Sequence, residues 1–253
     1  MSRALLVIAH GSRDPRHAAT VHALVGRVRS LRPGLRVETA FLDFNGPTVS
    51  QALASLYLSG VREVVALPLL LTRAFHAKAD VPAVLAESAT RLPDLSVRLA
   101  DVLGPHPLLV ASLERRLAEA GVGLTPADRA TTGVVLASAG SSDPEAIAVI
   151  AEIAREWRLT GWCAVRPAFA SAALPRTEDA VRALRADGAR RVAVAPYVIA
   201  PGFLPDRITT GARAAGADAV AEVLGATPEL ARLLLHRYDT APAARTPLTA
   251  LTA

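Results

Sequence analysis

Short apolar runs alternate with amphipathic segments along most of the chain. An uninterrupted apolar run between turn residues is typical of a strand buried in a parallel sheet, whereas apolar positions three and four apart indicate a helix. Residues 15–31 show the second pattern, and Asp14 and Pro15 supply a cap and a proline suited to the first helical position. The first pattern predicts strands over residues 4–9, 35–41, 62–69, 95–100, 133–138, 163–169, 190–197 and 218–223.

This pattern occurs twice. Segments of the first half match segments of the second in the same order: residues 5–15 with 133–144, 37–47 with 165–175, 59–81 with 187–208, and 101–109 with 222–230. So long a period indicates duplicated domains rather than a solenoid of short repeats. We therefore expect one domain over residues 1–122, a second copy over 123–238, and a flexible Pro/Thr/Ala-rich tail over 239–253.

Each copy contains strands that alternate with helices. This order predicts an α/β fold related to the Rossmann and flavodoxin folds, with a parallel four-stranded sheet flanked by helices in each copy. Ligands of such sheets bind outside the carboxyl ends of the strands. His10 follows the first strand, Asp43 the second and His76 the third. The three side chains are therefore expected at one edge of the first sheet.

Imidazoles and a carboxylate at one edge are suited to metal or proton chemistry. A neutral imidazole binds ions such as Fe²⁺, Co²⁺, Ni²⁺ and Zn²⁺ and accepts a proton near neutral pH. The spacing alone still allows purely structural histidines. The second copy adds a comparison, because it keeps the glycine turn and the Asp-Pro helix start but has Ala139 where the first copy has His10. The histidine is therefore the part of the motif expected to serve chemistry.

The turn "HGSRDP" at residues 10–15 has other interpretations. Its backbone and the following helix N-terminus could bind a phosphate, although the Walker lysine and a GxGxxG motif are missing. Ser12 could act as a nucleophile beside His10, although no GxSxG elbow surrounds it. The remaining histidines are expected to be surface or turn residues of helices: His17, His22, His106 and His236.

Composition narrows the class of protein. The 253 residues are 51% hydrophobic and 20% charged, which is typical of a globular protein. A single cysteine, Cys163, excludes an internal disulfide and a multi-cysteine metal centre. The sequence shows no apolar stretch of membrane-spanning length and no signal-peptide pattern, so we expect a cytoplasmic protein.

The charge pattern favours a small anionic partner. The net charge is +5, and arginines carry it, since Lys78 is the only lysine. These arginines form no dense run and few aromatic residues accompany them, which disfavours nucleic acid as a partner. Guanidinium groups pair bidentately with carboxylates, so a polyanionic small molecule fits better.

Three segments resemble one known family. "AHGSRDP" (9–15), "AFLD" (40–43) and "LPLLLTRAFHAKADVP" (67–82) are similar to the sirohydrochlorin chelatase family of the CbiX and SirB type, within the class II tetrapyrrole chelatases. The resemblance covers about residues 4–230, and the duplication matches the family's two-domain form. It implies insertion of Fe²⁺ or Co²⁺, with Ni²⁺ as a further candidate, into sirohydrochlorin on the siroheme or cobalamin route, without a nucleotide.

The resemblance also implies roles for particular residues. His10 and His76 would perform the metal and proton work, and Asp43, where the family more often has Glu, would be a third ligand. Contacts to the substrate carboxylates would come from Ser12, Arg13, Arg73, Lys78 and Arg207.

The second copy departs from the family pattern. Ala139 and Leu204 stand at the positions of the two histidines, and Ser142 replaces Arg13. We expect this copy to be catalytically silent and to form the other wall of the binding cleft in a monomer. The alternatives are a tetrapyrrole or metal carrier without catalysis and, less favoured, an enzyme acting on a phosphate ligand.

Overall fold

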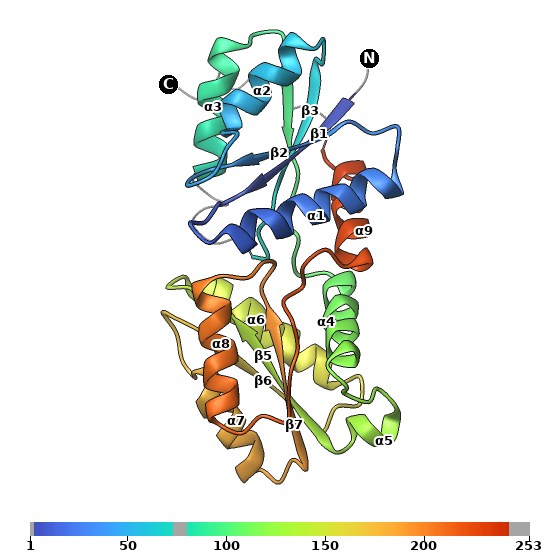
Figure 1. The fold of residues 1–253 in the computed structure, drawn as a ribbon, viewed down its shortest axis with the longest axis vertical. Coiled ribbons are helices and arrows are strands. Elements are labelled where there is room, and N and C mark those ends of the chain that lie inside the picture. Colours follow the sequence, from blue (N-terminus) through green and yellow to red (C-terminus); the bar gives the residue numbers. More distant parts are fainter. Residues whose placement is uncertain (1–2, 73–79, 243–253) are drawn as a thin grey trace. The chain divides into compact units, whose positions relative to one another are not determined.

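The computed structural model describes residues 3–72 and 80–242, in which strands and helices alternate (Figure 1). The first half contains β1 (Arg3–Ala9), α1 (Pro15–Leu31), β2 (Val37–Phe41), α2 (Val49–Leu58), β3 (Glu63–Pro68), α3 (Val81–Arg91) and β4 (Ser96–Leu99). Then follow α4 (Pro107–Glu119), α5 (Pro126–Arg129), β5 (Thr132–Ser138), α6 (Pro144–Arg158), β6 (Ala164–Phe169), α7 (Thr177–Ala186), β7 (Arg191–Tyr197), α8 (Phe203–Ala214), β8 (Ala219–Val220) and α9 (Pro228–Asp239). No helix in these described ranges is long and apolar enough to cross a membrane.

The strands form two parallel sheets, which confirms the predicted α/β fold. Their orders are β2-β1-β3-β4 and β6-β5-β7-β8, so both sheets have the same topology. The register repeats as well, because Leu5 pairs with Val37 in the first sheet and Val134 with Val165 in the second. The strand most unlike its prediction is β8, which covers Ala219–Val220 rather than residues 218–223.

Burial on both faces explains the uninterrupted apolar strands. From Ala4 to Ala9, every residue of β1 is at most 2% exposed, because α1 covers one face of the first sheet and α2 and α3 cover the other (Figure 1). Alternate residues such as Leu6 and Ile8 join Leu53 of α2 in a single core cluster. The second sheet is built likewise, with Val135 and Ala137 packed against α7 and α8.

Both predicted helix caps are present. The Asp14 carboxylate accepts the Arg16 backbone N–H at 2.9 Å, and Asp143 accepts the Glu145 N–H at the same distance. Proline follows the cap in each helix, where its missing N–H costs nothing. The two copies therefore begin their first helices in the same way.

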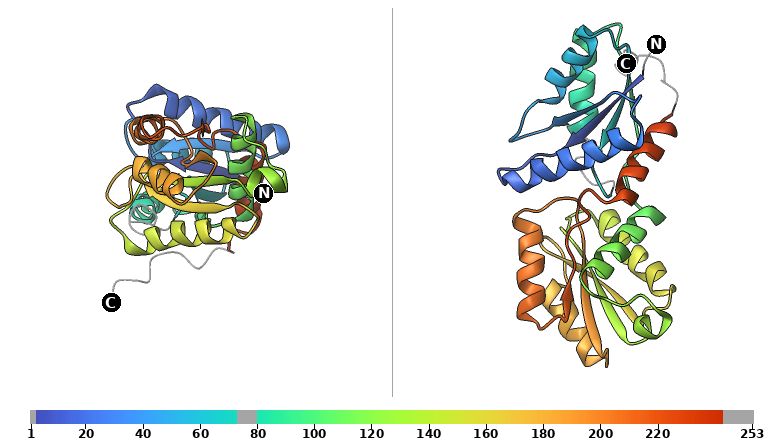
Figure 2. Two further views of the ribbon diagram at one scale, coloured as in Figure 1. Left: turned by 90° about the horizontal axis from the view of Figure 1, so that it is seen from below. Right: turned by 45° about the vertical axis from the view of Figure 1, so that its right-hand side comes forward.

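The compact units of the structure differ from the predicted domain boundaries. One unit comprises residues 1–104 and 230–253, and the other residues 105–229, so the boundaries at 122 and 238 do not match. Helix α4 packs on β7 and thus counts with the second unit. Helix α9 counts with the first from Leu230 on, and there the Tyr238 hydroxyl donates to the Arg3 carbonyl at 3.1 Å and Arg237 to the Leu103 carbonyl at 3.0 Å. Figure 2 shows α9 beside α1.

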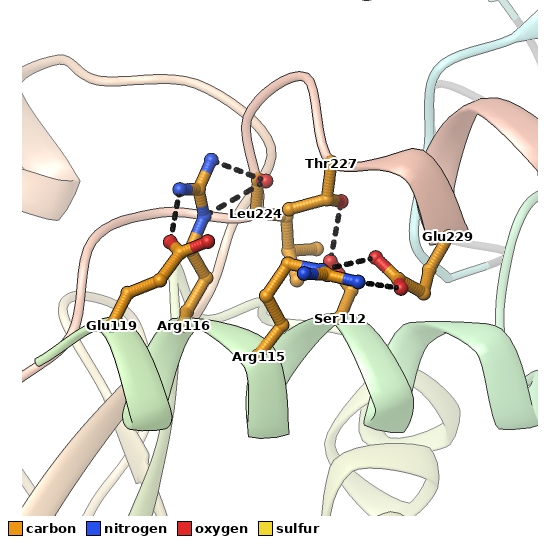
Figure 3. A network of polar contacts seen from close by, with 7 residues as sticks. All are labelled: Ser112, Arg115, Arg116, Glu119, Leu224, Thr227 and Glu229. Carbon is orange, nitrogen blue, oxygen red and sulfur yellow. Dashed lines mark hydrogen bonds and ion pairs between the residues drawn. The ribbon is translucent and has the colours of Figure 1, made fainter. Parts of the chain in front are cut away.

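Polar contacts hold α4 within the second unit (Figure 3). Ser112 and Thr227 share a hydrogen bond of 2.6 Å, and both residues are buried. Arg115 binds both carboxylate oxygens of Glu229, at 2.9 and 2.6 Å. Arg116 donates to the Leu224 carbonyl at 3.1 Å. The amphipathic pattern of a helix does not show which of two sheets it covers, so these contacts were not predictable from the sequence.

Candidate active site

His10 lies at the carboxyl end of β1, between the ends of β2 and β3, where it was predicted. Its side chain is half-buried, and Nδ1 is 3.2 Å from the Gly11 carbonyl oxygen. In the tautomer that carries its proton on Nδ1, this contact is a hydrogen bond and Nε2 keeps the lone pair. The Phe44 ring centre is 6.4 Å from that of His10.

The backbone of Asp43 is hydrogen-bonded directly to the backbone of His10. Its N–H donates to the His10 carbonyl at 2.8 Å, and Leu42 N–H donates to the Ala9 carbonyl at 3.0 Å. The residue is exposed, and its carboxylate accepts the Phe44 N–H at 2.8 Å. Two of the three predicted metal ligands, His10 and Asp43, therefore lie at one edge of the sheet.

Gly11 allows this close approach. Its φ is +96°, and a Cβ built on it would lie 1.8 Å from the Asp43 carbonyl oxygen. Only glycine fits there, for both backbone angle and space. Gly140 in the second copy has a φ of +93° and the same relation to Ser171, whose carbonyl oxygen would lie 1.9 Å from an added Cβ. The tight pairing of the two loops thus belongs to the fold of both copies.

Ser12 completes the turn through its backbone and side chain. Its N–H donates to the Asn45 side-chain oxygen at 2.8 Å, and its hydroxyl accepts the Asp14 N–H at 3.1 Å. Both contacts help to shape the turn. Asn45, which no sequence motif marks, thus ties the loop after β2 to the loop after β1.

Two arginines lie over exposed aromatic rings. The Arg13 guanidinium carbon is 5.3 Å from the centre of the Phe44 ring, which is 51% exposed. That of Arg207, on α8 in the second unit, is 5.9 Å from the Phe203 ring, which is 73% exposed. Each pair offers a flat apolar surface next to a positive charge. Both arginines are among the residues predicted from the sequence, whereas no sequence motif marks their aromatic partners.

The remaining predicted site residues lie outside the described residues. His76, Arg73 and Lys78 fall within 73–79, so the predicted ligand set of His10, Asp43 and His76 stays a prediction. Within residues 3–72 and 80–242, no group of three or more His, Cys, Asp or Glu side chains could hold a metal ion.

His17 is less exposed than was expected for a surface residue of α1. Its side chain is half-buried, and its Nδ1 is fully buried without a hydrogen-bond partner in the described part of the chain. Burial lowers the pKa of His17, the nearby His10 lowers it further, and Asp14 opposes the shift. The imidazole therefore favours its neutral form beside the candidate site.

The other histidines agree with structural roles. His106 caps α4, with its Nδ1 accepting the Leu108 N–H at 3.1 Å. His22 is exposed and packs against the edge of Phe41, with ring centres 5.8 Å apart.

The corresponding edge of the second copy is apolar at the two histidine positions. Ala139 and Leu204 pack against the core cluster of the second sheet. Ser171, at the position of Asp43, donates its hydroxyl hydrogen to the Ala139 carbonyl at 2.9 Å. The same loop geometry is thus kept without imidazole or carboxylate chemistry.

Two parallel α/β units of identical strand order, one with an imidazole and a carboxylate at its ligand edge, define a duplicated doubly wound protein. At the positions of His10 and Asp43 the second copy has Ala139 and Ser171. Sequence comparison gives the family: the chain belongs to the CbiX family, that of the sirohydrochlorin chelatases, whose model matches residues 4–120 and 133–241.

Individual relatives agree over most of the chain. It is 30% identical over 209 residues to the sirohydrochlorin cobaltochelatase of Priestia megaterium, covering 81% of this chain and 67% of the relative. It is 28% identical to the sirohydrochlorin ferrochelatase of the same organism, covering 94% and 90%. The structure of SirB from Bacillus subtilis with Fe³⁺ superposes with a TM-score of 0.82 at 24% identity, covering 94% and 95%.

Proposed function

We propose that this protein inserts a divalent metal, Fe²⁺ or Co²⁺, into sirohydrochlorin without a nucleotide. The asymmetry between the copies carries the proposal. Both copies have the strand, the glycine turn and the capped helix, but only the first has His10 and Asp43 at the carboxyl edge. The two Priestia megaterium relatives, named as chelatases of sirohydrochlorin, support it.

The reaction requires proton acceptors and a loosely held metal. A macrocycle that binds a divalent ion at its four nitrogens releases two pyrrole N–H protons. His10, with its Nδ1 at the Gly11 carbonyl, would accept a proton on Nε2. His76 would serve as the second imidazole. Together with Asp43 these groups would hold the ion at three positions and leave others open for transfer.

The substrate carries many carboxylates around a flat ring system. The Arg13–Phe44 pair at the ligand edge of the first unit combines an aromatic face with a guanidinium. Arg207 and Phe203 form a similar pair on α8. We propose that these pairs bind substrate carboxylates and ring edges, that Arg73 and Lys78 add charge, and that Ser12 acts by shaping the turn.

The test is anaerobic metal insertion, followed by the absorbance change of the tetrapyrrole. His10→Ala and His76→Ala should each lower the rate by about 100-fold or more, the usual range for losing a general base. His22→Ala is the matched control, because it removes an exposed histidine from α1 of the same unit. Full rates in both site variants would refute the assignment.

The same assay distinguishes a chelatase from a tetrapyrrole carrier. A carrier would bind sirohydrochlorin and show the uncatalysed rate of insertion, whereas a chelatase accelerates it. Parallel assays with Fe²⁺, Co²⁺ and Ni²⁺ measure metal preference, since an imidazole–carboxylate site accepts several first-row ions. We expect turnover with Fe²⁺ and Co²⁺.

A further inference from the structure

A second polar site lies at the opposite edge of the second sheet. A cavity of about 660 Å³ opens at the amino ends of β5, β6 and β7, within the unit of residues 105–229. Thr131 and Cys163 line it just before β5 and β6. Its charged lining residues are Arg158, Arg166, Arg190 and Asp187. Three guanidiniums thus surround a cavity that holds one carboxylate.

The first copy has arginines at two of the corresponding positions. Arg29, the counterpart of Arg158, donates to the Val37 carbonyl at 3.0 Å and lies 3.7 Å from Glu38. Arg62, the counterpart of Arg190, donates to the Tyr57 carbonyl at 2.8 Å and stacks on the Tyr57 ring at 4.1 Å. In this copy both guanidiniums have internal partners.

The second copy lacks the side-chain partners. Arg166 stands at the position of Glu38 and Arg185 at that of Tyr57, so the sequence supplies neither the carboxylate nor the aromatic ring. Asp187 is used by Arg166, which donates a hydrogen bond to it. Neither the Arg158 nor the Arg190 guanidinium has a hydrogen bond or ion pair with any other described residue. The residues are exposed, so water solvates the excess charge.

We propose that this cavity binds a small, multiply charged oxyanion, with Arg158 and Arg190 as its principal contacts. Guanidinium groups form charge-assisted, often bidentate hydrogen bonds with phosphate and carboxylate oxygens. An anion between the two guanidiniums would replace the internal partners that Arg29 and Arg62 have in the first copy. The site is independent of the ligand edge proposed for metal insertion, because it lies at the amino ends of the strands.

Cys163 supplies a reporter inside the cavity. It is the only cysteine of the chain, and it is partly exposed. Its reaction rate with an aromatic disulfide reagent can be measured on the full-length protein, with inorganic pyrophosphate in one arm and citrate in the other. A bound anion should slow labelling by about tenfold at about ten times its dissociation constant, because only the free fraction reacts.

The variants make the test specific to the two guanidiniums. Arg158→Gln and Arg190→Gln should each abolish protection without lowering the melting temperature of the unliganded protein, since neither side chain has an internal partner. Arg166→Glu restores the carboxylate of the first copy and should also abolish protection. Arg213→Gln is the matched control, because it removes an exposed guanidinium from α8 outside the cavity and should leave protection unchanged.

Either anion can support the proposal, and the comparison of the two arms distinguishes a phosphate from a carboxylate ligand. Absence of protection by both would overturn it. So would protection that survives in Arg158→Gln and Arg190→Gln, since the anion would then bind elsewhere. The experiment leaves the metal-insertion assay untouched, so its failure and that of the proposed function can be told apart.

Discussion

Replacing Gly11 with alanine should separate the fold of the ligand edge from its chemistry. The new Cβ would lie 1.8 Å from the Asp43 carbonyl oxygen and 2.9 Å from its carbonyl carbon. Ordinary contact begins near 3.4 Å, so the loop carrying Asp43 must retreat by about 1.5 Å. This retreat would stretch or break the hydrogen bond from Asp43 N–H to the His10 carbonyl, now 2.8 Å long.

The energetic cost follows from two sources. Alanine at a φ of +96° costs about 1–3 kcal/mol of backbone strain, and displacing the packed loop costs about another 1–3 kcal/mol. The total of about 2–6 kcal/mol corresponds to a fall in melting temperature of about 4–24 °C for a protein of this size, at about 2–4 °C per kcal/mol. The catalytic effect should be larger, because displacing a reacting group by about 1 Å can cost 100-fold in rate.

Gly140→Ala is a control that the duplication provides. Its Cβ would lie 1.9 Å from the Ser171 carbonyl oxygen, so strain and crowding match those at Gly11. We expect similar losses of thermal stability in both variants, measured by calorimetry. At a temperature where both stay folded, Gly11→Ala should insert metal about 100-fold more slowly than wild type, and Gly140→Ala within about threefold of it. Equal rates in the two variants would refute the reasoning.

Three further predictions concern pH, packing and substrate affinity. Because the pKa of His17 in the folded protein lies below its ordinary 6.5, protonation of this side chain favours the unfolded chain. The free energy of unfolding should therefore fall as the pH drops below 6.5. His17→Gln should flatten this pH dependence in urea titrations. Ser112→Ala leaves the buried Thr227 hydroxyl without its 2.6 Å partner and should cost about 1–3 kcal/mol in denaturant unfolding, whereas the double variant Ser112→Ala, Thr227→Val should cost less. Arg13→Gln should raise KM for sirohydrochlorin more than it lowers kcat, in steady-state assays; an unchanged KM would contradict the substrate contact.

The sequence predicted those features that repeat along the chain. Apolar runs located the strands, and the duplicated Asp-Pro located the helix starts, because burial and capping impose local patterns. The positions of His10 and Asp43 at one edge followed from topology alone. The bond between their backbones did not, since it depends on the close approach at Gly11, which a sequence shows only as a glycine.

His17 lies four, seven and eleven residues before Val21, Leu24 and Val28, so it falls on the buried face of α1 and its partial burial follows the helix period. The placement of α4 and α9 in the compact units depends instead on contacts between distant segments. An apolar helix face fits either sheet. Which sheet the helix covers is determined by pairs such as Arg115 and Glu229, which lie more than a hundred residues apart in the sequence.

The assignment of α9 also sets an order of assembly during synthesis. The unit of residues 105–229 is continuous, so it can fold as soon as it has left the ribosome. The first unit waits for the last helix: the guanidinium of Arg32 must reach Asp239, at 2.6 Å, across more than two hundred residues of chain. Until then the surface that Leu234 and Tyr238 later cover stays open to water. The half that carries the candidate chemistry is therefore the last to be completed, although its strands are made first.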